Sequence, residues 1–489
     1  MLRRAFAALF ALLSLTFAAA EEGTSLTEAR TQVLRLLHDG RFDEAEEALR
    51  DGGALPPGPD RDFLRAFVLY WRLLYDSENA DLKAGFNSRL DAALASAGAR
   101  LAEAPRDAEA LLWSGTAHLF LAELRASEKR PIAAAMEARR ARHALSESYG
   151  VDSGMADALF GLGTVDVLAA ELPGLAKGLG AFLGLSGDRG RGIASLERAA
   201  SEGRTFSLEA RLFLLGIRSS RKKRIYGGAL AEADLVAEAA PRSVVALDGA
   251  ARVRIALGDA ARAAGELDAA LALAAASPRT DRTVLANLLV RRAAADLSMF
   301  RPDLAFSWLH RLLPLRSAIS RETRKDGAEI ARSAASATAA PPWYPELAAA
   351  LGLGAAPSAP AGSEPDPWMK AIPALDLERA GEPARAADQL EALASESPDE
   401  PFFAMLAGRA ALLAGRTETA RALLSRAGAS ARLPKAWLGP CLLLEGRAAD
   451  LAGERTAALA LYRRAADAPW FADKEAAWFH LTVPYRGAS

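Results

Sequence analysis

The chain has 489 residues, of which 51% are hydrophobic and 25% are charged. This length exceeds that of a typical single domain, so it predicts either several domains or one long repeat array. The 60 basic and 61 acidic residues nearly cancel, which argues against a bulk electrostatic attraction to nucleic acid or to an anionic membrane.

The first twenty residues predict a signal peptide for export. Arg3 and Arg4 give a positively charged start, residues 5–17 are apolar, and Ala18 and Ala20 surround a small-residue cleavage site. We therefore expect cleavage after Ala20 and a periplasmic or extracellular mature protein, with an uncleaved N-terminal anchor as the alternative. No later stretch offers about 18 uninterrupted apolar residues, so we expect no transmembrane segment in the mature chain.

Residues 24–335 are predicted to form an irregular array of helix pairs. Ala, Leu, Arg and Glu are abundant, and runs of alternating β-branched residues are hard to find. Two of the pairs are marked by a turn glycine followed by a small and then a large apolar residue: Gly40, Ala45 and Leu49; Gly258, Ala263 and Leu267.

A Gly-rich central segment, residues 172–192, interrupts this array. Its apolar part, Leu175–Leu185, either fills a gap between repeats or contacts a lipid or an apolar peptide. The Gly187–Gly192 run has the glycines of a phosphate-binding loop. No strand precedes it and no Lys-Ser/Thr follows it, so we interpret it as the start of a helix with Asp188 as N-cap.

Residues 336–367 are rich in Ala, Pro, Ser and Gly, and they are predicted to be a linker. A C-terminal array of three helix pairs is expected over residues 368–489. Its turn glycines lie 34 and then 38 residues apart. A small Ala follows each glycine after five residues, and a large residue follows after nine: Gly381, Ala386 and Leu390; Gly415, Ala420 and Leu424; Gly453, Ala458 and Tyr462.

Each position in this pattern has a physical reason. Glycine permits a tight turn, alanine lets the two helices of a pair approach, and the large residue fills the groove between them. The pattern resembles the tetratricopeptide repeat (TPR), whose period is about 34 residues. We therefore expect an all-α, helix-pair solenoid with a right-handed superhelix, in two arrays joined by the linker. An ordinary helical bundle with chance spacing is the alternative.

The central segment carries a further resemblance. The order Glu171-Leu172-Pro173-Gly174, then an apolar run, then Gly187-Asp188-Arg189 is similar to bacterial exported TPR proteins. These are related to the family of outer-membrane and inclusion-body-clearance repeat proteins. The ending Val483-Pro484-Tyr485 also looks like the C-terminal end of that family. The basic Ser219–Arg224 stretch and the linker depart from the family pattern. The resemblance implies no catalytic residues and no cofactor.

Candidate binding residues come from charge and aromatic content. The basic run Arg221, Lys222, Lys223 and Arg224 is either a solvated helix end or a docking site for an acidic partner. Trp470 and Trp478 belong to an aromatic C-terminus that either caps the last repeat or binds a partner. Cys441, the single cysteine, lies in an apolar run and is expected to be buried.

The sequence shows no catalytic motif. The five histidines lack metal-ligand spacing, and neither H-E-x-x-H nor G-x-S-x-G occurs. The leading hypothesis is a non-catalytic scaffold for protein–protein interactions in the cell envelope, with a protein or peptide partner, peripheral envelope association and no nucleic acid. The alternatives are a periplasmic carrier of apolar or lipid ligands and an enzyme with an unrecognised site.

Overall fold

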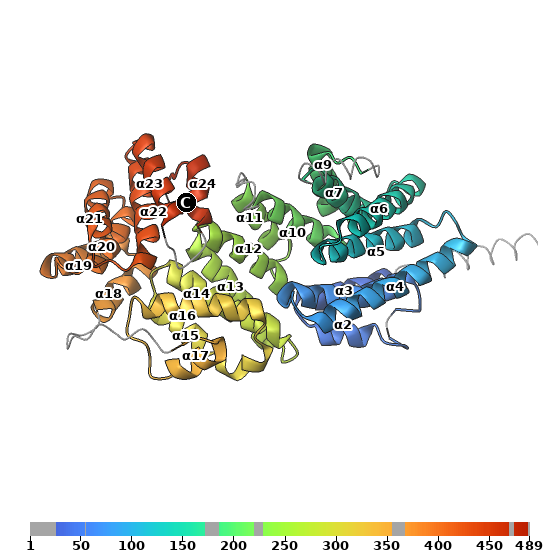
Figure 1. Ribbon diagram of the computed structural model, residues 1–489, viewed down its shortest axis with the longest axis horizontal. Coiled ribbons are helices and arrows are strands. Elements are labelled where there is room, and N and C mark those ends of the chain that lie inside the picture. The colour runs from blue at the N-terminus through green and yellow to red at the C-terminus, as the bar shows by residue number, and fades with distance from the viewer. Residues whose placement is uncertain are drawn as a thin grey trace, which may run out of the picture. The chain divides into compact units, whose positions relative to one another are not determined.

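A computed structural model describes residues 26–53, 55–171, 185–219, 228–354, 367–468 and 474–487. These residues form helices and connecting turns, and none of them lies in a strand (Figure 1). The predicted all-α class is therefore confirmed. No helix in the described ranges is both long enough and apolar enough to cross a membrane.

The chain divides into two compact units, which are described separately. Unit 1 runs to Leu214 and also includes Ala239–Ala246 and Leu273–Asp281. Unit 2 comprises Leu215–Glu238, Leu247–Ala272 and the chain from Arg282 onward. This division differs from the predicted one, which placed the boundary in the linker over residues 336–367.

Unit 1 begins with a helix over residues 26–38, and each later helix packs mainly on its neighbours in the sequence. Its helices are α2 (Phe42–Ala48), α3 (Pro59–Tyr75), α4 (Ala80–Glu103), α5 (Ala108–Ser127), α6 (Pro131–Val151), α7 (Asp157–Ala170), α9 (Arg189–Glu202) and the first part of α10 (Ser207–Arg218).

The starts of these helices follow from local chemistry. The side chains of Asn79 and Asp107 accept hydrogen bonds from backbone N–H groups in the first turns of α4 and α5. Asp188 accepts the Arg191 N–H at 2.9 Å, which confirms it as the N-cap of α9. Pro59 and Pro131 stand in the first turns of α3 and α6, where a missing N–H costs little.

An aromatic core fills unit 1. Phe63 and Phe67 of α3 pack against Trp113 and Phe120 of α5 and against Phe206, with ring centroids 5.3–6.0 Å apart. Each of these side chains is at most 3% exposed. This core joins helices that are distant in the sequence, because Phe206 lies beside α10.

Unit 2 continues the same kind of packing. It contains the end of α10 and most of α11 (Ala229–Ala239), α12 (Val244–Leu257) and α13 (Ala260–Ala276), whose residues 239, 244–246 and 273–276 belong to unit 1. Its other helices are α14 (Arg282–Ser298), α15 (Pro302–His310), η1 (Leu313–Ala318), α16 (Arg321–Ala335), α17 (Tyr344–Leu351), α18 (Pro367–Arg379), α19 (Pro383–Glu396), α20 (Pro401–Leu413), α21 (Thr417–Ala429), α22 (Lys435–Leu451), α23 (Arg455–Asp467) and α24 (Glu475–Thr482).

The C-terminal helices form three pairs, α18–α19, α20–α21 and α22–α23, which stack in sequence order as a solenoid (Figure 1). Gly381, Gly415 and Gly453 lie in the turns within these pairs, with φ of +82°, +76° and +78°. A residue with a side chain rarely adopts this left-handed backbone conformation, so glycine suits all three turns.

The predicted linker is partly helical. α17 lies inside residues 336–367, and its Tyr344 and Leu347 are 2% and 0% exposed. Pro345 occupies the first turn of α17, and Gly352 ends the helix in the left-handed conformation. The proline and glycine that indicated a linker are thus the boundaries of a short helix, and the linker prediction was wrong for this part. Residues 355–366 lie outside the described part of the chain.

Candidate binding site in the C-terminal pairs

The two helices of a pair come closest at a glycine on the first helix. A Cβ at Gly408 of α20 would lie 2.6 Å from Leu424 Cγ of α21. A Cβ at Gly446 of α22 would lie 2.5 Å from Tyr462 Cε1 of α23. Both distances are far shorter than a carbon–carbon contact, so only glycine fits at these two positions.

The expected alanines lie in the same interface. Ala386, Ala420 and Ala458 are each 0% exposed. The Ala420 carbonyl oxygen is 3.2 Å from the position that a Cβ at Gly408 would take. Glycine on the first helix and alanine on the second together set the spacing of a pair.

An arginine follows each of these close-approach glycines. Arg409 pairs with Glu378 at 2.6 Å, and its guanidinium lies 5.1 Å from the centre of the Phe300 ring. Arg447, at the equivalent position of α22, lies 5.0 Å from the centre of the Tyr485 ring. Two consecutive first helices therefore place a cation on an aromatic ring at the same position of the repeat.

The two arginines differ in their counter-charges. Arg447 makes no ion pair with a carboxylate among the described residues, and its Nε donates to Nε2 of His480 at 3.1 Å. Burial lowers the pKa of Arg447, and the charge of Arg409 acts in the same direction. A Cβ at Gly258 would collide with the Arg447 guanidinium, so this turn glycine leaves room for it. Arg447 is thus a half-buried cation that contacts a histidine and an aromatic ring, while the charge of Asp259 acts to raise its pKa.

His480 supports Arg447 as a neutral acceptor. The side chain of His480 is 4% exposed, and burial together with the charge of Arg447 lowers its pKa to about 3. Its Nδ1 lies 3.2 Å from the Val483 carbonyl oxygen. The two contacts assign the proton to Nδ1 and leave the Nε2 lone pair for Arg447.

The end of the solenoid is closed by a polar and aromatic cluster. Asp450 accepts hydrogen bonds from the Tyr462 hydroxyl and the Tyr485 N–H, both at 2.8 Å, and pairs with Arg455 at 2.9 Å. Tyr462 stacks on His480 with ring centroids 5.3 Å apart. These contacts tie residues after α24 to α22 and α23.

The structure describes only some of the binding residues predicted from the sequence. Trp478 is half-buried and packs against the apolar cluster of α22 and α23, as a cap would. The basic run 221–224, Trp470 and the Gly-rich residues 172–184 lie outside the described residues. Cys441 is 0% exposed, and burial raises the pKa of its thiol to about 12, as expected for a structural thiol.

Sequence reasoning missed Arg409, Arg447 and His480. The available signal was the dipeptide Gly-Arg at residues 408–409 and 446–447, seven residues before the turn glycines in two successive pairs. The position of His480 beside Arg447 depends on how α24 folds back, and no spacing in the sequence indicates it.

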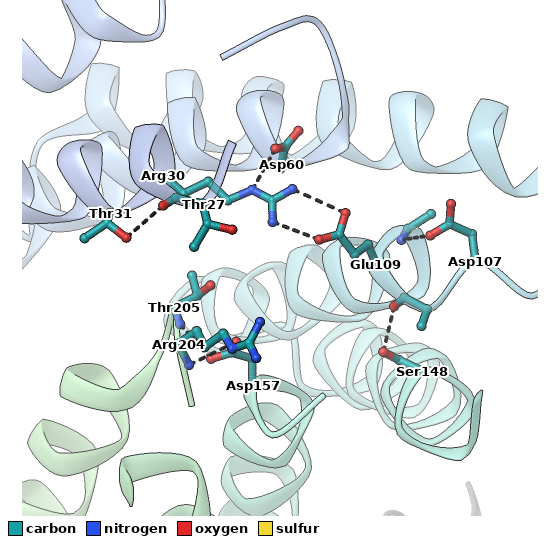
Figure 2. A network of polar contacts seen from close by, with 12 residues as sticks. Thr27, Arg30, Thr31, Asp60, Asp107, Glu109, Ser148, Asp157, Arg204 and Thr205 are labelled. Carbon is teal, nitrogen blue, oxygen red and sulfur yellow. Dashed lines mark hydrogen bonds and ion pairs between the residues drawn. The ribbon is translucent and has the colours of Figure 1, made fainter. Parts of the chain in front are cut away.

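Unit 1 contains a second polar network, with structural roles (Figure 2). Arg30 pairs with Asp60 of α3 at 2.9 Å and with Glu109 of α5 at 2.8 Å, so it joins three helices. Asp157, which is 6% exposed, accepts the N–H groups of Thr205 and Phe206, both at 2.9 Å. The backbone leading into α10 is thereby tied to the start of α7.

No group of three His, Cys, Asp or Glu residues in the described ranges has the arrangement of a metal site. The arrangement in unit 2 is one of positioned cations and aromatic rings along stacked helix pairs. It defines a helical-repeat protein built from stacked helix pairs.

Comparison with known proteins gives structural neighbours only. No family model matches the chain, and no curated protein matches it. Among solved structures, the TPR domain of P58(IPK) is 12% identical, with 86% of this chain and 96% of that chain covered and a TM-score of 0.22. The Cut9–Hcn1 hetero-tetramer of APC/C is 14% identical, with 83% and 80% covered and a TM-score of 0.21. The helix-pair assignment rests on the packing described above.

Proposed function

We propose that the chain is a non-catalytic scaffold of the cell envelope that binds an acidic segment of a partner protein along the first helices of its C-terminal pairs. The observation that carries this proposal is Arg447. It occupies a repeated position, and it has no carboxylate partner among the described residues. A half-buried cation is stabilised when an anion completes its surroundings. A partner carboxylate would supply that anion.

The helix-pair architecture supports the same function. In stacked helix pairs a bound segment meets side chains of the first helices. Most of α20 and α22 is buried, and Arg409 and Arg447 are among the residues of these helices that stay partly accessible. Arg409 is already neutralised by Glu378. Arg447 should therefore attract an acidic group of a partner more strongly than Arg409 does.

Proximity labelling in the source organism, with the full chain as bait, tests this function. The variant Arg447→Met removes the charge and keeps much of the side-chain volume. Arg432→Met is the control, because Arg432 is 69% exposed and its pair with Asp399 is a surface contact. We expect Arg447→Met to lose labelled proteins that Arg432→Met retains. An identical set of labelled proteins for both variants, each with wild-type helical content, would contradict the proposal.

The envelope location rests on residues 1–20, which lie outside the described part of the chain. Their charged start, apolar core and small residues before Glu21 support export. Mass spectrometry of the N-terminus of exported protein tests this directly. A mature chain that begins at Glu21 is expected, and membrane-bound protein that retains Met1 would overturn it.

A further inference from the structure

A short segment without regular structure, residues 483–487, follows α24 at the end of the described chain. Its first residues alternate between half-buried and exposed. Val483 and Tyr485 are half-buried, whereas Pro484 and Arg486 are exposed. Alternation of this kind is typical of an extended segment that has one side on the protein and the other in solvent.

Few contacts hold this C-terminal segment on the last helix pair. The Tyr485 N–H donates to Oδ2 of Asp450 at 2.8 Å, and the side chain of Asp450 is 1% exposed. The Tyr485 ring stands edge-on to that of His480, with centroids 5.6 Å apart, and the Val483 carbonyl oxygen lies 3.2 Å from Nδ1 of His480. The end of a chain with so few contacts opens more readily than a packed helix does.

The same segment covers Arg447. The guanidinium carbon of Arg447 lies 5.0 Å from the centre of the Tyr485 ring. A guanidinium has five N–H groups, and within the described residues only the Nε–H of Arg447 donates a hydrogen bond, to Nε2 of His480. A Cβ at Gly258 would lie 2.4 Å from Nη2 of Arg447. Tyr485, His480 and Gly258 are therefore three close neighbours of the guanidinium.

These three neighbours differ in how easily they can move away. His480 belongs to α24, and Gly258 lies in the turn between α12 and α13, so each is fixed by packed helices. Of the three, only Tyr485 belongs to a segment without regular structure. The guanidinium of Arg447 can thus be uncovered on the Tyr485 side without separating any helices.

We propose that residues 483–487 act as an autoinhibitory strap, in which Tyr485 covers the guanidinium of Arg447 until an anionic group of a partner displaces it. A ring offers the cation only an attraction to its face, whereas a carboxylate accepts charge-assisted hydrogen bonds, which are stronger. An acidic segment can therefore replace the ring, and a neutral segment cannot. The inference rests on the proposed function, because it concerns the regulation of the same arginine.

The rate at which phenylglyoxal modifies Arg447 in the full chain, followed by mass spectrometry of its peptides, tests whether Tyr485 covers this side chain. Tyr485→Ala removes the ring, and it should raise the rate at least about tenfold. Arg486→Ala is the matched control, because Arg486 is an exposed residue of the same segment, and it should keep the wild-type rate. Arg254, whose side chain is 1% exposed, reports on unfolding. An unchanged rate at Arg447 in Tyr485→Ala, or an equal rise at Arg254, overturns the strap.

Proximity labelling distinguishes this inference from the proposed function. Proteins whose labelling depends on Arg447 should be labelled more strongly by Tyr485→Ala than by the wild type, and Arg486→Ala should label them as the wild type does. If such proteins exist but Tyr485→Ala does not label them more strongly, the strap fails and the proposed function stands. If no labelled protein depends on Arg447, the proposed function fails, and autoinhibition fails with it.

Discussion

Replacing Gly408 by alanine tests the helix spacing on which the C-terminal solenoid depends. The new Cβ would lie 2.6 Å from Leu424 Cγ and 3.2 Å from the Ala420 carbonyl oxygen. Leu424 is 0% exposed, so its side chain can move only against the residues packed around it. Overpacking of this kind costs about 1–3 kcal/mol. Alanine has a better helix propensity than glycine, which offsets about 1 kcal/mol of that cost.

The control is Gly265→Ala in α13 of the same unit. A Cβ at Gly265 meets nothing within 4 Å, so only the gain in propensity remains. The free energy of unfolding of Gly408→Ala should therefore lie about 1–3 kcal/mol below that of Gly265→Ala. Urea denaturation followed by circular dichroism measures the difference.

A double-mutant cycle identifies the cause. Leu424→Ala alone should cost about 2–5 kcal/mol, because it opens a cavity. Combined with Gly408→Ala it should cost less than the sum, with a coupling of about 0.5–3 kcal/mol. Equal stabilities of Gly408→Ala and Gly265→Ala, or simple additivity in the cycle, would refute the close approach at Gly408.

Three further predictions follow from packing and charge. Ala420→Leu should destabilise the chain by about 1–3 kcal/mol in urea denaturation, whereas Ala460→Leu on the exposed face of α23 should change little. A fragment of residues 282–489 should melt cooperatively at a higher temperature than residues 368–489, because the shorter fragment lacks the partners of Trp437 and Asp376. Equal melting temperatures of the two fragments would count against this. Between pH 4.5 and about 7 the native Glu123 carboxyl binds more protons than the unfolded one. The free energy of unfolding should therefore fall as pH rises through this window, and Glu123→Gln should show a weaker fall.

The sequence predicted the C-terminal pairs because their determinants are local. A turn glycine, a small residue five positions later and a large one nine positions later each act within one pair. Outward-facing alanines were harder to assign. Ala468, the C-cap of α23, has no neighbour in the sequence that marks it as buried, and yet it is 7% exposed and belongs to the apolar cluster of the last pair.

The predicted separation of residues 368–489 from the preceding array failed because it depends on contacts between distant segments. The Trp437 ring lies 5.4 Å from that of Phe300, and its Nε1 donates to the Ser336 hydroxyl at 3.2 Å. Arg301 pairs with Asp376 at 2.7 Å. These contacts place the C-terminal pairs in one compact unit with α14–α16. Composition alone showed only a Pro- and Ala-rich stretch between them.

The candidate binding residues were predictable only in part for the same reason. Gly-Arg repeats are visible in the sequence, but the lack of a carboxylate beside Arg447 is a property of the fold. Glu123 resembles any other glutamate on a helix until the fold desolvates its carboxyl and raises its pKa to about 7. Charge balance over the whole chain gives no information about which acids and bases meet.

Ion pairs between successive helix pairs match the charges of each pair to those of its neighbour. Arg416 of the second pair holds Asp388 of the first at 2.6 Å, and Glu454 of the third pair holds Arg421 of the second at 2.7 Å. Each pair thus carries charges that match one particular neighbour. An exchanged, duplicated or deleted pair would bring non-matching charges together, so these units are not interchangeable modules. If a helix pair were added or removed, residues on both sides of the new contact would have to change for the charges to match.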